Sequence, residues 1–120
     1  MPGRTEQRRA PRIQPYLAPC RLLHAGRRLP GYVVELGPVG ARVSCDAEPP
    51  AAGEAVVLEV RFSRGAMHSP LPAEVKWTRA PDAAGGGHQV GLIFRDVSPD
   101  QQRVLDGVLD EFRRRAALLA

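Results

Sequence analysis

Short apolar runs separated by turn residues fill most of the chain, and this pattern limits its fold more than any other feature. No long helix is expected between the runs. Parallel strands need a crossover of about a dozen residues or more, usually a helix, so these strands must pair with antiparallel neighbours. The sequence therefore predicts a small all-β barrel or sandwich of six antiparallel strands. The expected strands are 18–24, 29–36, 41–44, 55–62, 71–79 and 88–94.

Alternation of apolar and polar residues predicts which face of a strand each side chain occupies. In the fifth expected strand, Ala73, Val75 and Trp77 alternate with polar residues. We therefore expect Trp77 to anchor the core or the barrel rim and not to offer a stacking surface. Glu59 and Glu74 fall on the opposite faces of their strands, where we expect them to point outward.

The period of the pattern changes after residue 97, and the sequence predicts a helix over 98–120. Ser98 is suited to the N-cap and Pro99 to the first helical position, while Gln101 completes a capping box with Ser98. An apolar stripe at helical spacing follows, so this helix should cover an open edge or mouth of the barrel. The stripe consists of Val104, Leu105, Val108, Leu109 and Phe112.

The beginning of the chain differs in composition from the rest. Residues 1–12 contain four arginines and one glutamate, a net +3, whereas the whole chain has a formal net charge of +4. Prolines and a glycine accompany these arginines, and Ile13 is the one branched aliphatic residue of the first fifteen. Such a segment cannot bury enough apolar surface to fold by itself. We expect one domain made of a flexible arm over 1–15, a barrel over 16–97 and the helix.

Two short segments carry the functional interpretation. Arg8 and Arg12 form an R-x-x-x-R pattern in the arm. After 22 intervening residues, Glu35, Gly37 and Gly40 form E-x-G-x-x-G. In this order the two segments resemble the signature motifs of the PilZ domain, which are R-x-x-x-R and (D/N)-x-(S/A)-x-x-G.

The resemblance extends over nearly the whole chain and implies both a fold and a ligand. It implies a six-stranded β-barrel that binds the bacterial second messenger cyclic di-GMP without catalysing a reaction. Arg8 and Arg12 would hold phosphate and guanine, with Arg9 next to them, and Glu35 and the turn over 37–40 would line the opposite side. A guanidinium group can chelate phosphate oxygens, pair with guanine O6 and N7, and stack on the base. Further similarity to the family lies in segments 73–77, 90–94 and 96–98.

The second motif departs from the family pattern at two positions. Glu35 keeps the carboxylate but adds one methylene, and Gly37 removes a hydroxyl whose hydrogen bond contributes roughly 0.5–1.5 kcal/mol. Gly40 is retained, and we expect glycine to supply a positive φ in this turn. The alternative function is therefore a PilZ-fold adaptor that does not bind cyclic di-GMP and acts through a protein partner, for instance in motility or pilus assembly.

Other chemistries have less in their favour. An arginine-rich arm can also follow a nucleic-acid backbone, but the rest of the chain adds little positive charge, so we do not expect a nucleic-acid partner. The histidines His24, His68 and His88 lack metal-ligand spacing, and we expect Cys20 and Cys45 to be buried free thiols. Without a catalytic motif, we expect no enzyme activity and no cofactor. Without a membrane-length apolar run or a signal peptide, we expect a cytoplasmic protein that does not insert into the membrane.

Overall fold

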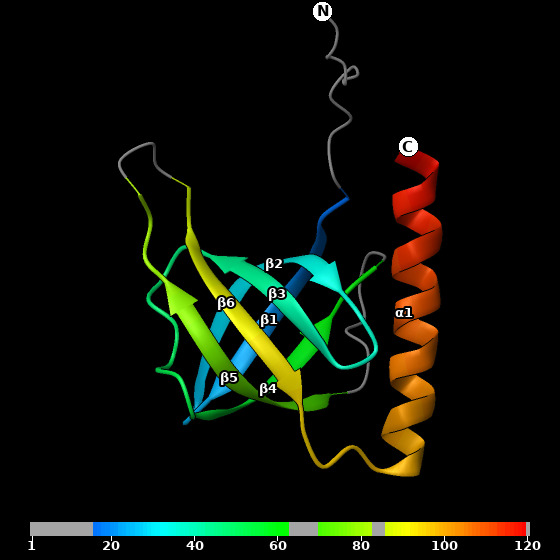
Figure 1. The fold of residues 1–120 in the computed structure, drawn as a ribbon, viewed down its shortest axis with the longest axis horizontal. Coiled ribbons are helices and arrows are strands. Elements are labelled where there is room, and N and C mark those ends of the chain that lie inside the picture. Colours follow the sequence, from blue (N-terminus) through cyan, green and yellow to red (C-terminus); the bar gives the residue numbers. More distant parts are fainter. Residues whose placement is uncertain (1–15, 63–69, 83–85, 120) are drawn as a thin grey trace, which may run out of the picture.

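The computed structural model describes residues 16–62, 70–82 and 86–119, which form six strands and one helix (Figure 1). The all-β fold class with one C-terminal helix is confirmed, and the expected strands differ from the observed ones only at their ends. The arm expected over 1–15 lies outside the described residues. The elements are β1 (Ala18–His24), β2 (Arg27–Leu36), β3 (Gly40–Cys45), β4 (Ala55–Val60), β5 (Leu71–Arg79), β6 (His88–Phe94) and α1 (Pro99–Leu119).

The six strands close into a barrel in the order β1-β2-β3-β6-β5-β4, and every neighbouring pair is antiparallel. The wall therefore has no unpaired strand edge. Alternate side chains point into the barrel and fill it, as is usual for a barrel of this size. Because the interior is a packed core, a ligand can bind only on the outer surface or at a mouth. The fully buried side chains that fill the barrel include Leu22, Val33, Val43, Leu58, Val60, Val75 and Val90.

Helix α1 lies beside the barrel mouth at which β2, β4 and β6 end (Figure 1). Four residues of its predicted apolar stripe are buried and Val104 is partly buried, and Val108 and Phe112 join the core of the barrel. The ring of Phe112 meets Tyr16 edge-on at 5.2 Å between centroids, and Tyr16 stacks with Phe62 at 6.5 Å. The Arg115 guanidinium lies 5.6 Å from the centroid of the Phe62 ring. The helix thus closes the mouth with aromatic rings, as its apolar stripe predicted.

The predicted capping box starts this helix. The backbone N–H of Gln101 donates to the Ser98 hydroxyl at 3.1 Å, and the backbone N–H of Ser98 donates to the Gln101 side-chain oxygen at 2.9 Å. These bonds satisfy donors that the first turn of a helix otherwise leaves without partners. In the described part of the chain, no helix is both long and apolar enough to cross a membrane.

Two β-bulges reverse the side-chain alternation of the strands that contain them. In β2 the register shifts between Val33 and Glu35, and in β5 it shifts between Val75 and Trp77. Each bulge adds one residue to its strand. After the bulge, a residue that strict alternation would place inside the barrel faces outward instead. The expectation that Trp77 belongs to the inward-facing set with Val75 is therefore wrong. Trp77 lies on the outer surface and is 38% exposed.

The two cysteines are buried free thiols, as expected. Both pair in register with Gly31 of the strand between them, Cys20 from β1 and Cys45 from β3. Burial, together with the charge of Cys45, raises the pKa of Cys20 to about 12. Burial, together with the charge of Asp46, also raises the pKa of Cys45.

These thiols should resist alkylation in the folded protein. Both thiols are buried, and at about pH 8 a thiol with a raised pKa carries less thiolate, which is the reactive form, than a free cysteine does. We therefore expect iodoacetamide to leave Cys20 and Cys45 largely unmodified in native protein and to modify both in urea, as measured by mass spectrometry. Rapid modification of Cys20 in native protein, at the rate seen in urea, would contradict its placement in the core.

Candidate functional site

The second sequence motif lies where β2 turns into β3. Glu35 is near the end of β2, Gly37 begins the turn and Gly40 begins β3. The backbone N–H of Gly37 donates to the carbonyl of Gly40 at 2.9 Å, and the carbonyl of Val39 accepts from the N–H of Phe94 at 2.9 Å. The second of these bonds ties the turn to the end of β6. The motif is thus held at a defined place on the barrel wall.

The glycines of this turn are not there for a left-handed backbone. The positive-φ glycines among the described residues are Gly26, Gly53 and Gly86, so the expected positive φ in the Gly37–Gly40 turn is wrong. Gly40 is needed instead because a Cβ there would overlap the carbonyl oxygen of Leu92 on the neighbouring strand β6. Gly37 has open space, since a Cβ would find its nearest neighbour 3.9 Å away.

Substitution of the two glycines should therefore have different effects. Gly40→Ala should force β3 away from β6 and destabilise the fold by about 1–3 kcal/mol, the usual range for an added methyl in a tightly packed place. Gly37→Ala is the matched control and should change the free energy of unfolding by less than about 0.5 kcal/mol. Urea unfolding of both variants measures this difference. Equal effects of the two substitutions would contradict the close approach of β3 and β6.

A cavity of about 400 Å³ opens on the outer wall beside this turn. It contains all three described residues of the predicted site, Glu35, Gly37 and Gly40, and adds two cationic side chains and one aromatic ring. The barrel wall under it consists of β2, β3, β6 and β5 in that order. The lining residues are Glu35, Leu36, Gly37, Val39, Gly40, Ala41, Arg42, Lys76, Trp77, Gly91 and Leu92.

A row of four residues crosses this cavity, one from each strand. Glu35 pairs in register with Arg42, Arg42 with Gly91, and Gly91 with Trp77. Nε of Arg42 donates to the Glu35 carboxylate at 3.1 Å, and Nη1 of Arg42 donates to the side-chain oxygen of Gln89 at 3.1 Å. We call these four residues the outer row: Glu35, Arg42, Gly91 and Trp77.

The indole of Trp77 lies directly over Gly91. A Cβ on Gly91 would overlap Nε1 and Cε2 of the indole, so only glycine lets the ring lie against the β6 backbone. Lys76, the extra residue of the β5 bulge, lies next to it and also lines the cavity. An exposed flat ring beside ammonium and guanidinium groups can stack with a planar base and attract an anion.

Sequence reasoning found only part of this site. The structure brings Glu35, Gly37 and Gly40 together, whereas Arg8, Arg9 and Arg12 lie outside the described residues. Sequence reasoning missed the pocket residues Arg42, Lys76 and Trp77, and it missed Gln89, which accepts a hydrogen bond from Arg42. Arg42 alternates with the apolar Ala41 and Val43 in the expected strand 41–44, which is a signal for an outward-facing side chain, but no local pattern revealed the bulge that turns Trp77 outward.

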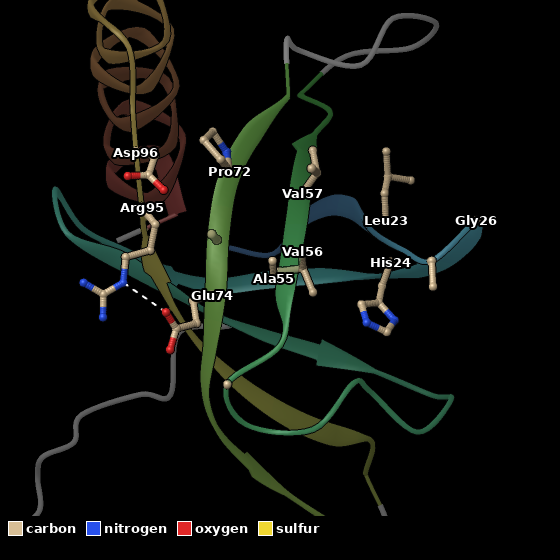
Figure 2. Close-up of a pocket in the computed structure, with 13 residues that line it drawn as sticks. Leu23, His24, Gly26, Ala55, Val56, Val57, Pro72, Glu74, Arg95 and Asp96 are labelled. Carbon is tan, nitrogen blue, oxygen red and sulfur yellow. Dashed lines mark hydrogen bonds and ion pairs between the residues drawn. The ribbon is translucent and has the colours of Figure 1, made fainter.

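A second, larger hollow of about 580 Å³ lies on the outer face of β1, β4 and β5 (Figure 2). Its floor is apolar, with Leu23, Val57 and Pro72 in one cross-strand row. Figure 2 shows Glu74 and Arg95 joined at one side, at 3.2 Å. No residue of the predicted site lines it, and Arg95, paired with Glu74, is the only lysine or arginine among its lining residues, whereas the outer-row cavity has Lys76 in addition to the paired Arg42. It is therefore less suited than the outer-row cavity to an anionic ligand.

The outward placement of the two strand glutamates is confirmed. Glu74 pairs with Arg95, and Glu59 accepts from Nε of Arg21 at 2.6 Å. Within the described ranges, no three histidine, cysteine or acidic side chains are grouped closely enough to hold a metal ion.

The sequence profile of the PilZ domain matches residues 6–111. The chain belongs to the PilZ domain family. This family has a receptor-type fold for cyclic di-GMP, and the barrel and the helix agree with it. No curated protein sequence matches the chain.

Solved structures share this fold at low sequence identity. The PilZ domain of YcgR from Escherichia coli, solved with c-di-GMP, is 19% identical with a TM-score of 0.66, over 92% of this chain and 95% of that one. The PilZ domain of CeSA from a cellulose-synthesizing bacterium is 16% identical with a TM-score of 0.62, over 86% and 99%. The Bacillus subtilis inhibitor of motility MotI/DgrA is 15% identical with a TM-score of 0.62, over 92% and 52%.

Proposed function

We propose that this PilZ domain is a non-catalytic receptor for cyclic di-GMP and that it binds this ligand at the outer row. The observation that carries the proposal is the composition of one cavity. The turn of the second PilZ motif, two cationic side chains and an exposed indole line the same hollow on the barrel wall. The ligand has two flat bases, which can stack on the indole, and two phosphates, which can pair with the cationic side chains.

Each group in the cavity has a distinct role in this proposal. The exposed face of Trp77 stacks with one guanine, a contact that contributes about 1–3 kcal/mol per base in other nucleotide-binding proteins. Lys76 attracts a phosphate as a point charge. Gly37 and Gly40 carry no side chains, so the ligand can approach the backbone of the turn at these two positions.

The arm completes the site in this proposal. Arg8 and Arg12 of the first motif hold phosphate and guanine from the side opposite the barrel wall, with Arg9 beside them. Arginine is suited to this because its planar fork can bind a phosphate through two hydrogen bonds and can also stack on a base. A segment that becomes ordered only with ligand would turn ligand concentration into a structural change, which a protein partner can read.

Calorimetric titration tests the receptor function. We expect heat of binding when cyclic di-GMP is added to the native chain at tens of micromolar protein. Arg8→Ala or Arg12→Ala should each weaken binding by roughly tenfold or more, because each removes a charged hydrogen-bond donor whose bonds contribute about 1.5–3 kcal/mol. Arg113→Ala is the matched control, since Arg113 is exposed on α1 and belongs to neither motif.

Two results of this titration would contradict the proposal. Absence of heat with the native chain would favour the adaptor alternative, in which the PilZ barrel has lost the ligand and acts through a protein partner. Equal affinity of the Arg8, Arg12 and Arg113 variants would mean that the arm takes no part in binding. The departure at Gly37, where the family has a small polar or alanine side chain, is the observation that favours the alternative.

A further inference from the structure

We infer that Arg42 reads a guanine base in the outer-row cavity and that Glu35 is a positioning residue that holds Arg42. The inference rests on the proposed function, because it concerns the same site and the same ligand. It assigns a role to a residue outside both sequence motifs. It also changes the role of Glu35 from a direct contact with the ligand to a support for the contact.

The guanidinium of Arg42 is held from two sides. Glu35 accepts from Nε at 3.1 Å, and Gln89 accepts from Nη1 at 3.1 Å. Glu35 comes from β2 and Gln89 from β6, the two strands that flank β3, so the side chain is braced across the sheet. Cross-strand and diagonal pairs of this kind restrict a long side chain before the ligand binds. The side chain therefore loses less conformational entropy on binding.

The braced guanidinium still has donors for a ligand. An arginine carries five N–H groups, and two of those on Arg42 are used by Glu35 and Gln89. The remaining three N–H groups donate to no acceptor within residues 16–62, 70–82 and 86–119. The Arg42 side chain is 31% exposed and lines the cavity, so these donors are within reach of a bound molecule.

Guanine is the base that fits these donors. It presents two acceptors, O6 and N7, on one edge, whereas adenine replaces O6 with an amino donor that would face the guanidinium. With one base stacked on Trp77, Arg42 is the next outward-facing side chain along the outer row, beyond Gly91. The pair of Trp77 and Arg42 therefore combines a base platform with a guanine-selective edge.

The extra methylene of Glu35 has a use in this arrangement. An aspartate at position 35 would be shorter by roughly 1.5 Å, one carbon–carbon bond. The 3.1 Å contact with Arg42 would then lengthen beyond hydrogen-bond distance. Glutamate is therefore not a weakened copy of the aspartate of the family motif. Replacing Glu35 with that aspartate should release Arg42 and reduce guanine selectivity. If residue 35 contacted the ligand directly, the same replacement should instead improve binding.

The test compares the dissociation constants of cyclic di-GMP and cyclic di-AMP by calorimetry, on the native chain and on variants. Arg42→Ala should lower the preference for the guanine ligand by roughly tenfold or more, since one two-bonded arginine–guanine contact contributes about that much discrimination. Glu35→Asp should lower it in the same direction. Glu35→Gln keeps an oxygen at the same reach and should retain most of the preference. Arg113→Ala should leave it unchanged.

The double variant separates positioning from direct contact. In the Arg42→Ala background, Glu35→Asp should cause no further loss, because the residue that it positions is gone. Thermal unfolding of each variant shows that the fold is retained. Tighter binding of cyclic di-GMP by Glu35→Asp, or an unchanged guanine preference in Arg42→Ala, would overturn the inference and leave the receptor function intact. Absence of binding by the native chain would instead overturn the receptor function.

Discussion

The register of two bulged strands decides what this barrel presents to its surroundings. A bulge in β2 turns Glu35 outward, and a bulge in β5 does the same for Trp77. Without either bulge, strict alternation would direct a carboxylate or an indole into a packed apolar core, which costs free energy for the carboxylate and cannot fit the ring. The bulges also bring both residues into the outer row with Arg42 and Gly91, so the candidate site depends on these two β-bulges.

Closure of the barrel explains why the site needs glycines. The interior is filled with aliphatic side chains and α1 covers one mouth, so the outer wall and the opposite mouth are the places left for a ligand. In the outer-row cavity, glycines leave room beside the strands. Gly91 lets the indole of Trp77 lie flat against β6, and Gly40 lets β3 approach the carbonyl of Leu92. The shape of the cavity therefore depends on the missing side chains of Gly40 and Gly91 as well as on the side chains that line it.

Much of the fold could be predicted because it depends on local patterns. Strand periodicity, the capping box at Ser98 and the apolar stripe of α1 each act within a few residues, and the structure has all three. The candidate site could be predicted only where a motif marks it, at Glu35, Gly37 and Gly40. The place of Trp77 depends on a bulge, and the proposed role of Arg42 depends on partners from two other strands. Both are consequences of strand pairing, which short-range patterns do not contain.

Trp77 provides the most direct measurement, because it is the only tryptophan in the chain. If cyclic di-GMP binds at the outer row, the ligand covers the indole. Its fluorescence should then change saturably during titration, with the same midpoint as the heat of binding, and acrylamide should quench it less in the complex. A full calorimetric binding curve without any change in Trp77 fluorescence or quenching would contradict this placement of the ligand.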